Sequence, residues 1–360
     1  MRPRVWQVLA ALAAGLMTMS QAACGGGEEA DAEGFPVGLL LPSRSVPRWE
    51  HSDRPLIEKR LKDLCPRCTV EYANAENDAD RQRQQVTTMI TKGVKVLILD
   101  AADTRALRSS IREAHQAGVP VVAYDRLAEG PISGFVSFDG EQVGRLQGEA
   151  LVKAMGERAK SKQVVMLNGD PTSPNAAWYR KGALSAMAGK VKIGRSYDTL
   201  GWSAGNAHAH MSAAIAALGP ARIGGVLAAN DEMAAGAIAA LKSAGVTKLP
   251  PITGQDAELD AVRRIIDGEQ YMTVYKPFGK EAAAAAAMAV ALGRGEDADT
   301  VATTTTDSPT TRGIPSVLLT PSMVTARTIE QTLVKDDLYT VDEICTRNLR
   351  PACQKAGLTQ

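Results

Sequence analysis

The chain has 360 residues, of which 45% are hydrophobic and 22% are charged, and its formal net charge is +1. This length suits two domains of ~150 residues each, and the composition is that of a soluble globular protein. The near-neutral charge and the lack of a basic stripe argue against a protein that binds nucleic acid through electrostatic attraction.

The chain begins with the pattern of a secretory signal peptide at residues 1–23. Met1–Arg4 is positively charged, Val5–Met19 is largely apolar, and small alanines precede Cys24. The apolar stretch is too short for a comfortable membrane span. We therefore expect residues 1–23 to be removed and the mature protein to be exported.

Cys24 is followed by glycines and an acidic stretch, which we interpret as a flexible tether at residues 24–35. This pattern looks like the start of a bacterial lipoprotein, with a lipid on Cys24 that anchors the protein at the outer face of the cytoplasmic membrane. Gln21 departs from the pattern, because an aliphatic residue is usual three positions before the cysteine. The alternative is ordinary cleavage after Ala23, which gives a soluble secreted protein.

From residue 36 onward, apolar runs that suit buried strands alternate with helical segments. The expected strands are Val37–Leu41, Thr69–Ala73, Val94–Leu99 and Val119–Tyr124, and the helices between them are Asp53–Leu64, Asn77–Lys92 and Thr104–Ala117. Continuous runs of Val, Ile and Leu are typical of parallel strands that are covered on both faces. Gly93 and Gly118 suit the left-handed ends of helices.

The same alternation starts again in the second part of the chain. Its expected strands are Val164–Asn168, Val191–Tyr197, Gly225–Ala229 and Ile252–Gly254, and its helices are Ala176–Ala188, Ala204–Leu218 and Glu232–Ala244. We therefore predict an α/β protein with two Rossmann-like lobes, each with a parallel sheet wound by right-handed crossovers.

Later segments return to these lobes. Met272–Tyr275 is an expected strand, Lys280–Leu292 is an Ala-rich helix that suits the first lobe, and Ser316–Leu319 is expected to cross back to the second. A chain that passes several times between lobes makes a multi-stranded hinge. The expected boundaries are 36–139 and 276–313 for the N-terminal lobe, and 140–275 and 314–360 for the C-terminal lobe.

Four cysteines besides Cys24 form two close pairs in the sequence. Cys65 with Cys68 and Cys345 with Cys353 favour local disulfides, which form outside the cytoplasm. The sequence alone permits three connectivities. A zinc site is disfavoured because no second Cys pair or nearby His pair completes it, so no metal is expected.

Polar or aromatic residues follow several of the expected strands or lie close to them. They are Arg48, Trp49, Asp125, Arg126, Asn175, Trp202, Asn230, Asp256 and Lys276. Open α/β sheets bind ligands at the carboxyl ends of their strands. Carboxylates, guanidinium and amide groups suit paired sugar hydroxyls, and indole rings suit the apolar faces of a pyranose.

The chain resembles the periplasmic sugar-binding proteins of the ribose/xylose type, closest to the D-xylose-binding and multiple-aldose-binding group. The segments that carry this resemblance are Arg48-Trp49 with Asp53-Arg54, and residues 123–126, 136–139, 229–231, 253–256 and 273–277. Each is short, but they occur in the family's order over nearly the whole mature chain. The resemblance implies a type I periplasmic binding protein fold, with the nine residues above in contact with a ligand between the lobes.

Some of these residues also have structural alternatives. Asn230 or Asp231 could cap the following helix, and we expect Asp231 to take that role and Asn230 to bind ligand. Asp256 could likewise cap the helix after it. Ser173 stands where the related xylose-binding loop has an acidic residue, so a carboxylate acceptor is missing from this possible ligand loop. Trp178, just beyond it, suits either the helix core or the rim of the cleft.

The resemblance implies an extracytoplasmic substrate-binding lipoprotein of a sugar ABC importer, with a membrane permease as its partner. D-xylose is the first expectation for the ligand, and glucose, galactose and arabinose are the others. We expect a monomer without a cofactor or a nucleic-acid partner. The alternatives are a sugar-sensing component for a chemoreceptor or sensor kinase and, less in keeping with the pattern, a sugar-modifying enzyme. Asp125 and Asp256 could suggest glycoside hydrolysis, but the family order makes both of them hydroxyl acceptors.

Overall fold

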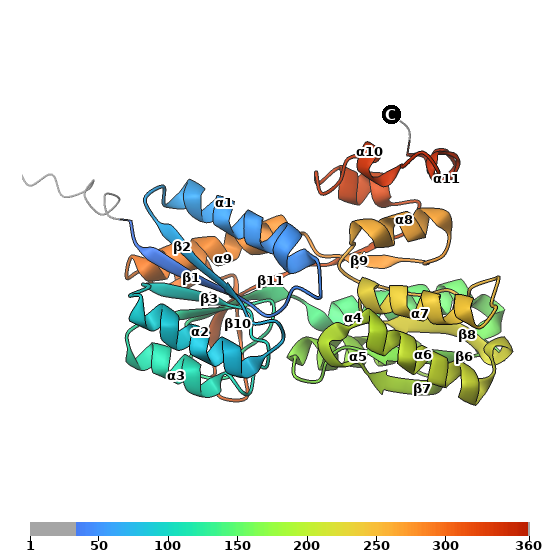
Figure 1. Cartoon of the computed structure of the whole chain (residues 1–360), viewed down its shortest axis with the longest axis horizontal. Coiled ribbons are helices and arrows are strands. Elements are labelled where there is room, and N and C mark those ends of the chain that lie inside the picture. Colours follow the sequence, from blue (N-terminus) through green and yellow to red (C-terminus); the bar gives the residue numbers. More distant parts are fainter. Residues whose placement is uncertain (1–33, 359–360) are drawn as a thin grey trace, which may run out of the picture.

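The structure is a computed structural model that describes residues 34–358. The predicted signal peptide, the lipidation at Cys24 and nearly all of the tether lie outside this range. The described chain forms two α/β lobes side by side, with the C-terminal segment packed on the second lobe (Figure 1). The predicted fold class, two lobes with mostly parallel sheets, is confirmed.

The first lobe is built on a seven-stranded sheet with the order β10-β11-β5-β4-β3-β1-β2. Its strands are β1 (Pro36–Leu41), β2 (Thr69–Asn74), β3 (Val96–Leu99), β4 (Val121–Tyr124), β5 (Gly134–Phe138), β10 (Thr304–Thr306) and β11 (Ile314–Leu319). All neighbouring pairs are parallel except β10 and β11. The central strands β3 and β4 are buried throughout, which explains their continuous apolar runs.

Helices cover both faces of this sheet (Figure 1). They are α1 (Arg54–Leu64), α2 (Ala79–Thr91), α3 (Arg108–Gln116) and α9 (Phe278–Gly293), and a short π-helical turn at Trp49–Asp53 precedes α1. Alternate residues of one strand show the two faces: Leu39 belongs to the apolar cluster that contains α1 and α9, whereas Leu40 belongs to the cluster of α2 and α3.

The second lobe has a three-stranded parallel sheet with the order β7-β6-β8, and a two-stranded antiparallel pair. The strands are β6 (Gln163–Asn168), β7 (Lys192–Asp198), β8 (Ile223–Ala228), β9 (Thr273–Tyr275) and β12 (Ser322–Val324). The helices are α4 (Gly140–Met155), α5 (Pro174–Met187), α6 (Ala204–Leu218), α7 (Asp231–Ser243) and α8 (Leu259–Asp267). Val164 and Met166 of β6 pack with α4 and α5, and Val165 and Leu167 belong to the cluster that contains α6 and α7.

The chain crosses between the lobes three times: after β5, after β9 and after β11. The expectation that the strand at Ser316–Leu319 belongs to the second lobe is wrong. It is part of β11, which pairs with β5 in the first lobe, so the last crossing follows residue 319 and the boundary at residue 313 is wrong too. An apolar strand of this length fits the open edge of either sheet, and only the tertiary structure decides between them.

The C-terminal segment forms α10 (Val341–Ile344) and α11 (Arg350–Ala356), which pack on α8 around their own apolar cluster. The disulfide Cys345–Cys353 lies within this segment, and Cys65–Cys68 follows α1, so the structure contains both local disulfides. No helix within residues 34–358 has the length and apolar character that a membrane crossing needs.

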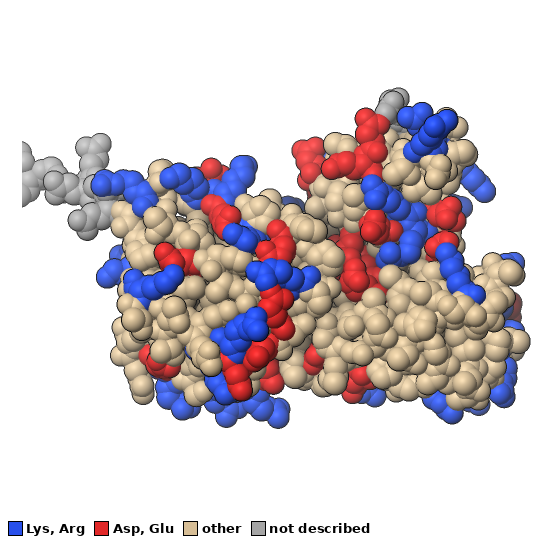
Figure 2. Space-filling view, viewed as in Figure 1, with Lys and Arg blue, Asp and Glu red and all other residues tan. Residues whose placement is uncertain are grey.

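Charged side chains of both signs are intermixed on the face shown in Figure 2. Ion pairs of the first lobe include Arg44 with Glu76 and Arg54 with Glu58. That face therefore offers no broad basic surface of the kind that nucleic acid requires.

Candidate functional site

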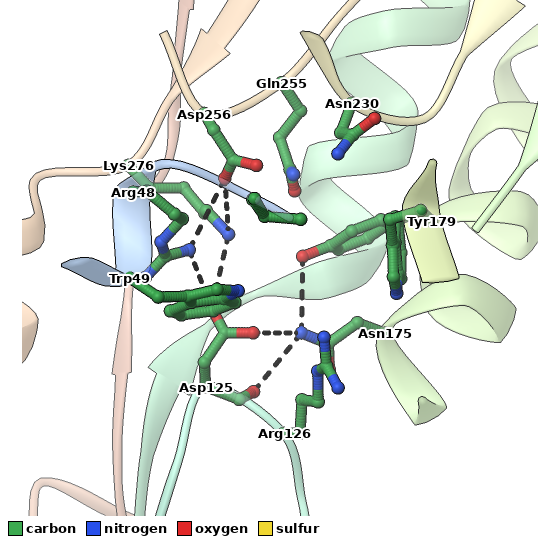
Figure 3. Close-up of a pocket in the computed structure, with 12 residues that line it drawn as sticks. Arg48, Trp49, Asp125, Arg126, Asn175, Tyr179, Asn230, Gln255, Asp256 and Lys276 are labelled. Atoms are coloured by element: carbon green, nitrogen blue, oxygen red, sulfur yellow. Dashed lines mark hydrogen bonds and ion pairs between the residues drawn. The ribbon is translucent and has the colours of Figure 1, made fainter. Parts of the chain in front are cut away.

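A buried cavity lies between the lobes, at the carboxyl ends of the strands (Figure 3). The space between its lining atoms, including any that is open to solvent, is about 280 Å³. Its lining residues are Val46, Arg48, Trp49, Asp125, Arg126, Asn175, Tyr179, Trp202, Asn230, Gln255, Asp256 and Lys276. The structure thus brings together all nine of the sequence-predicted binding residues.

Arg48 is the most heavily supported side chain of the cavity. Its Nε and Nη2 donate to both carboxylate oxygens of Asp53, at 2.8 and 2.7 Å. Nη2 also donates to Glu281 at 2.9 Å, and the guanidinium lies between the rings of Trp49 and Phe278, 4.1 and 4.2 Å from their centroids. These contacts fix the plane of the guanidinium, which leaves Nη1 directed at the cavity carboxylates.

Asp125 joins the two lobes directly. Its carboxylate accepts a hydrogen bond from Arg48 Nη1 at 3.0 Å, from Lys276 at 3.2 Å and from the amide of Asn175 in the second lobe at 2.6 Å. Burial alone raises the pKa of Asp125, but the charges of Lys276 and Arg48 outweigh burial and lower the pKa to about 2. Asp125 is therefore ionised at neutral pH and is a strong hydrogen-bond acceptor.

Lys276 lies at the second crossing between the lobes, directly after β9. Its ammonium group is 3.0 Å from Asp256 and 3.2 Å from Asp125. Burial and the neighbouring Arg48 act to lower the pKa of Lys276, but the two carboxylates raise it above its ordinary value. Arg126 is paired in a similar way, 3.4 Å from Asp100. Each cation of the cavity thus has a carboxylate partner in the protein, which suits a neutral ligand.

Backbone strain gathers at this site. Asp125 and Trp202 have φ of 54°, and Asp256 has φ of 97°. A positive φ is uncommon for residues other than glycine, and such strain persists only where the surrounding structure over-determines it. Asp125 directly follows β4, Trp202 lies in the turn after β7, and all three residues line the cavity.

Four buried polar atoms of the lining residues have no hydrogen-bond partner within residues 34–358. They are Nε1 of Trp49, Nε1 of Trp202, Oδ1 of Asn175 and Oε1 of Gln255. Buried polar groups are nearly always satisfied, because leaving one unpaired costs ~1–3 kcal/mol. Two donors and two acceptors around one cavity therefore point to a ligand that both accepts and donates hydrogen bonds.

The structure settles two helix caps. The expected cap at Asp231 is wrong: Asn230 caps α7, since its Oδ1 accepts from the backbone N–H of Met233 at 2.9 Å. Asp231 instead accepts from Gln270 and Thr273 in the core. Capping and cavity lining are compatible, because the cap uses only the oxygen of the Asn230 amide. Asp256 is not a cap, because α8 begins at Leu259.

Ser173 and Trp178 lie outside the cavity lining. Ser173 is buried just before α5, and its hydroxyl has no hydrogen-bond partner within the described chain. Trp178 is half-buried and packs against the cluster of α2 and α3 in the first lobe. Among residues 34–358, no group of three or more His, Cys, Asp or Glu side chains could hold a metal ion.

Sequence reasoning missed two polar lining residues, Tyr179 and Gln255. Tyr179 is one helical turn from Asn175, whose amide lies 3.4 Å from its hydroxyl, and its ring packs edge-on to Trp202 with centroids 6.1 Å apart. The spacing of four residues was an available signal, because it places both side chains on one helix face. Gln255 showed no comparable signal, because the resemblance at residues 253–256 pointed to Asp256 as the ligand contact.

The chain is similar to known periplasmic binding proteins over most of its length. The family model described as "Periplasmic binding protein domain" matches residues 37–297. The D-xylose-binding periplasmic protein of Escherichia coli (strain K12) is 32% identical over 321 residues, which cover 88% of this chain and 94% of that protein. The multiple sugar-binding periplasmic receptor ChvE of Rhizobium radiobacter is 32% identical over 328 residues, 86% of this chain and 92% of the receptor.

Solved structures of solute binding proteins also superpose on this chain. An ABC transporter solute binding protein from Clostridium phytofermentans with bound β-D-glucose superposes with a TM-score of 0.79 at 28% identity, over 86% of this chain and 99% of that one. The carbohydrate transporter solute binding protein from Chloroflexus aurantiacus, in complex with D-glucose, has a TM-score of 0.77 at 25% identity, over 85% and 97% of the two chains. The chain therefore belongs to the periplasmic binding protein family and has its type I fold.

Proposed function

We propose that this chain is the sugar-binding component of an ABC importer and that it holds one monosaccharide in the cavity between its lobes. The observation that carries the proposal is the set of four unpaired polar atoms around the cavity, two of which belong to indole rings. A sugar hydroxyl both donates and accepts, so a ring of hydroxyls can satisfy such a mixed set. The two relatives described above are named a D-xylose-binding protein and a multiple sugar-binding receptor, and these names support the same ligand class.

In this proposal the contacts divide between the lobes. Arg48, Asp125 and Arg126 bond hydroxyls from the first lobe, and Asn175, Asn230 and Asp256 bond them from the second. Lys276 lies at the crossing, and Tyr179 and Gln255 add a hydroxyl and an amide. Trp49 and Trp202 cover the apolar faces of the sugar ring, as expected for pyranose recognition. The pairing of each cation with a protein carboxylate favours a neutral aldose over a charged sugar.

Entry of the sugar requires the lobes to separate. The lining residues named above are buried, and Asp125 bonds Asn175 across the cleft. The described conformation is therefore a closed one, and a ligand that bonds both lobes stabilises it by differential affinity. The three crossings between lobes supply the hinge for this motion.

D-xylose is the first candidate ligand, and glucose is the second because the superposed solved structures hold it. Galactose and arabinose remain further candidates. We also propose an exported monomer with a lipid on Cys24, which delivers sugar to a membrane permease and has no enzymatic activity. Mass spectrometry of the mature N-terminus tests the lipid, because ordinary cleavage leaves an unmodified Cys24.

Calorimetry with xylose, glucose, galactose, arabinose and ribose tests the proposed ligand class. We expect micromolar or tighter binding of at least one aldose, which corresponds to about −8 kcal/mol or better. Failure to bind any pentose or hexose would overturn the proposal. Slow turnover of a bound sugar would instead revive the enzymatic alternative.

The same cavity would also serve a sugar-sensing receptor that presents its closed form to a chemoreceptor or sensor kinase. The observation that favours this alternative is the relative named a receptor, at 32% identity. Deletion of the gene decides between them: loss of sugar uptake supports transport, whereas loss of a sugar response with normal uptake supports sensing.

A further inference from the structure

A loop of the second lobe bonds the first lobe outside the sugar cavity. Residues 170–173 follow β6, and residues 102–104 follow β3 in the facing lobe. The backbone N–H and the hydroxyl of Thr104 both donate to the carbonyl oxygen of Thr172, at 3.3 Å each. The lobes are therefore joined at this point by protein groups alone.

Asp170 sets the position of that carbonyl. Its Oδ1 accepts from the N–H of Thr172 at 2.9 Å and from the hydroxyl of Thr172 at 2.7 Å. The Thr172 hydroxyl also lies 3.3 Å from the carbonyl of Ala102, but it has one proton and the nearer carboxylate is the stronger acceptor. Asp170 thus holds Thr172 with its carbonyl turned to the first lobe.

The second oxygen of the same carboxylate supports the turn that carries Trp202. Asp170 Oδ2 accepts from the backbone N–H of Gly201 at 2.5 Å. Gly201 and Trp202 have φ of 65° and 54°, so two successive residues of this turn are in the left-handed region. A turn of this kind needs external support, and Asp170 supplies it.

The indole also packs against the backbone next to Asp170. A Cβ added at Gly169 would lie 2.0 Å from the ring of Trp202, so only glycine permits this contact. The loop that bonds the first lobe and the ring that lines the cavity therefore meet at Gly169 and Asp170. Asp170 itself does not line the cavity.

We propose that Asp170 is a positioning residue that couples closure of the lobes to placement of Trp202. One carboxylate oxygen orders the loop that bonds the first lobe, and the other orders the turn that aims the indole. Movement of one loop is then transmitted to the other through this carboxylate, together with the packing of Trp202 on Gly169. This proposal rests on the proposed function, because it takes Trp202 as a group that contacts the sugar.

The test is Asp170→Asn, with Asp198→Asn as the matched control. Asparagine has one acceptor oxygen in place of two, so it cannot hold the donors of Thr172 and Gly201 together. Asp198 is an exposed carboxylate at the end of the neighbouring strand, where it accepts from Asn168 at 3.0 Å. Its substitution removes the same charge without touching either loop contact.

Two measurements separate the proposal from the proposed function. Amide hydrogen exchange in the ligand-free protein is expected to speed up by tenfold or more at Gly201 or Thr172 in Asp170→Asn, and to stay unchanged there in Asp198→Asn. The dissociation rate of each bound aldose is expected to rise about tenfold in Asp170→Asn, which is ~1.4 kcal/mol, without a change in the rank order of sugars.

Unchanged exchange at both amides in Asp170→Asn would show that the carboxylate does not hold the two loops. Faster exchange with unaltered sugar dissociation would show that it holds them without a role in binding. If the wild-type protein binds no sugar, the proposed function fails, and the amide exchange still decides whether Asp170 joins the loops.

Discussion

Arg48 and Asp256 are 208 positions apart in the sequence, yet the guanidinium Nη1 of Arg48 lies 3.4 Å from Oδ1 of Asp256. The two residues come from opposite lobes, and each is also a proposed sugar contact. A ligand that enters must therefore share or replace a bond that the protein makes with itself. Because of this exchange, each hydrogen bond to the sugar contributes less net free energy of binding. Affinity then depends on how well all the sugar hydroxyls fit the lining residues together, which favours selectivity between sugars.

Asp125→Ala is expected to weaken aldose binding by tenfold or more, which is about 1.4 kcal/mol. The substitution removes an acceptor for the sugar and leaves the buried Arg48 and Lys276 with one partner fewer. Calorimetry measures the loss. Asp260→Ala, which removes an exposed carboxylate on α8, serves as the control. An Asp125→Ala protein that binds as tightly as the wild type would show that this carboxylate is not a ligand group.

The contribution of Asp125 to stability is expected to depend on pH. Its pKa of about 2 in the folded protein lies below the value of about 3.9 in an unfolded chain. The stabilisation is therefore complete above about pH 4 and is lost as the pH falls to about 2, with an amplitude of about 2–3 kcal/mol. Urea unfolding of the wild type and Asp125→Asn measures it. A difference that stays constant over this pH range would contradict the assignment.

Sugar binding is expected to change the tryptophan fluorescence through Trp49 and Trp202. Both rings line the cavity and are 3% and 7% exposed, so their surroundings change when a sugar enters. Trp178 lies outside the cavity lining but packs against the first lobe, so Trp178→Phe should lose only the part of the signal that comes from closure of the lobes. Trp202→Phe should lose part of the signal and weaken binding by about 1 kcal/mol. A signal that disappears in Trp178→Phe would place the spectroscopic change away from the cavity.

Loss of the Cys345–Cys353 disulfide is expected to destabilise the C-terminal segment without a change in sugar affinity. The bridge closes a short loop, for which chain entropy gives about 2–3 kcal/mol. Cys353 is buried in the apolar cluster on α8, remote from the cavity lining. Thermal unfolding and calorimetry of Cys345→Ala/Cys353→Ala measure the two quantities. Equal stability of the double variant and the wild type would show that the bridge is dispensable.

The sequence predicted the cavity well because its residues stand at strand ends, where local pattern and chemistry coincide. It did not predict Asp53 and Glu281 as the supports of Arg48. The pair of Arg48 and Glu281 spans 233 positions, and no local pattern shows a contact of that range. The sequence also did not show that Asn230, and not Asp231, caps α7. Both residues suit a helix cap, and only the donors of Gln270 and Thr273 explain why Asp231 is drawn into the core.

The position of β11 has a consequence for the order in which the chain can fold. β11 lies beside β5 in the first lobe, yet 175 residues, 139–313, separate the two strands in the chain. Most of the second lobe lies within that interval, so the sheet of the first lobe is completed only after the chain has passed through most of the second lobe. Until residue 319 is in place, β5 presents an unpaired edge that can join the strands of other molecules. A protein truncated before residue 314 should therefore aggregate, even though it contains all the residues that line the cavity.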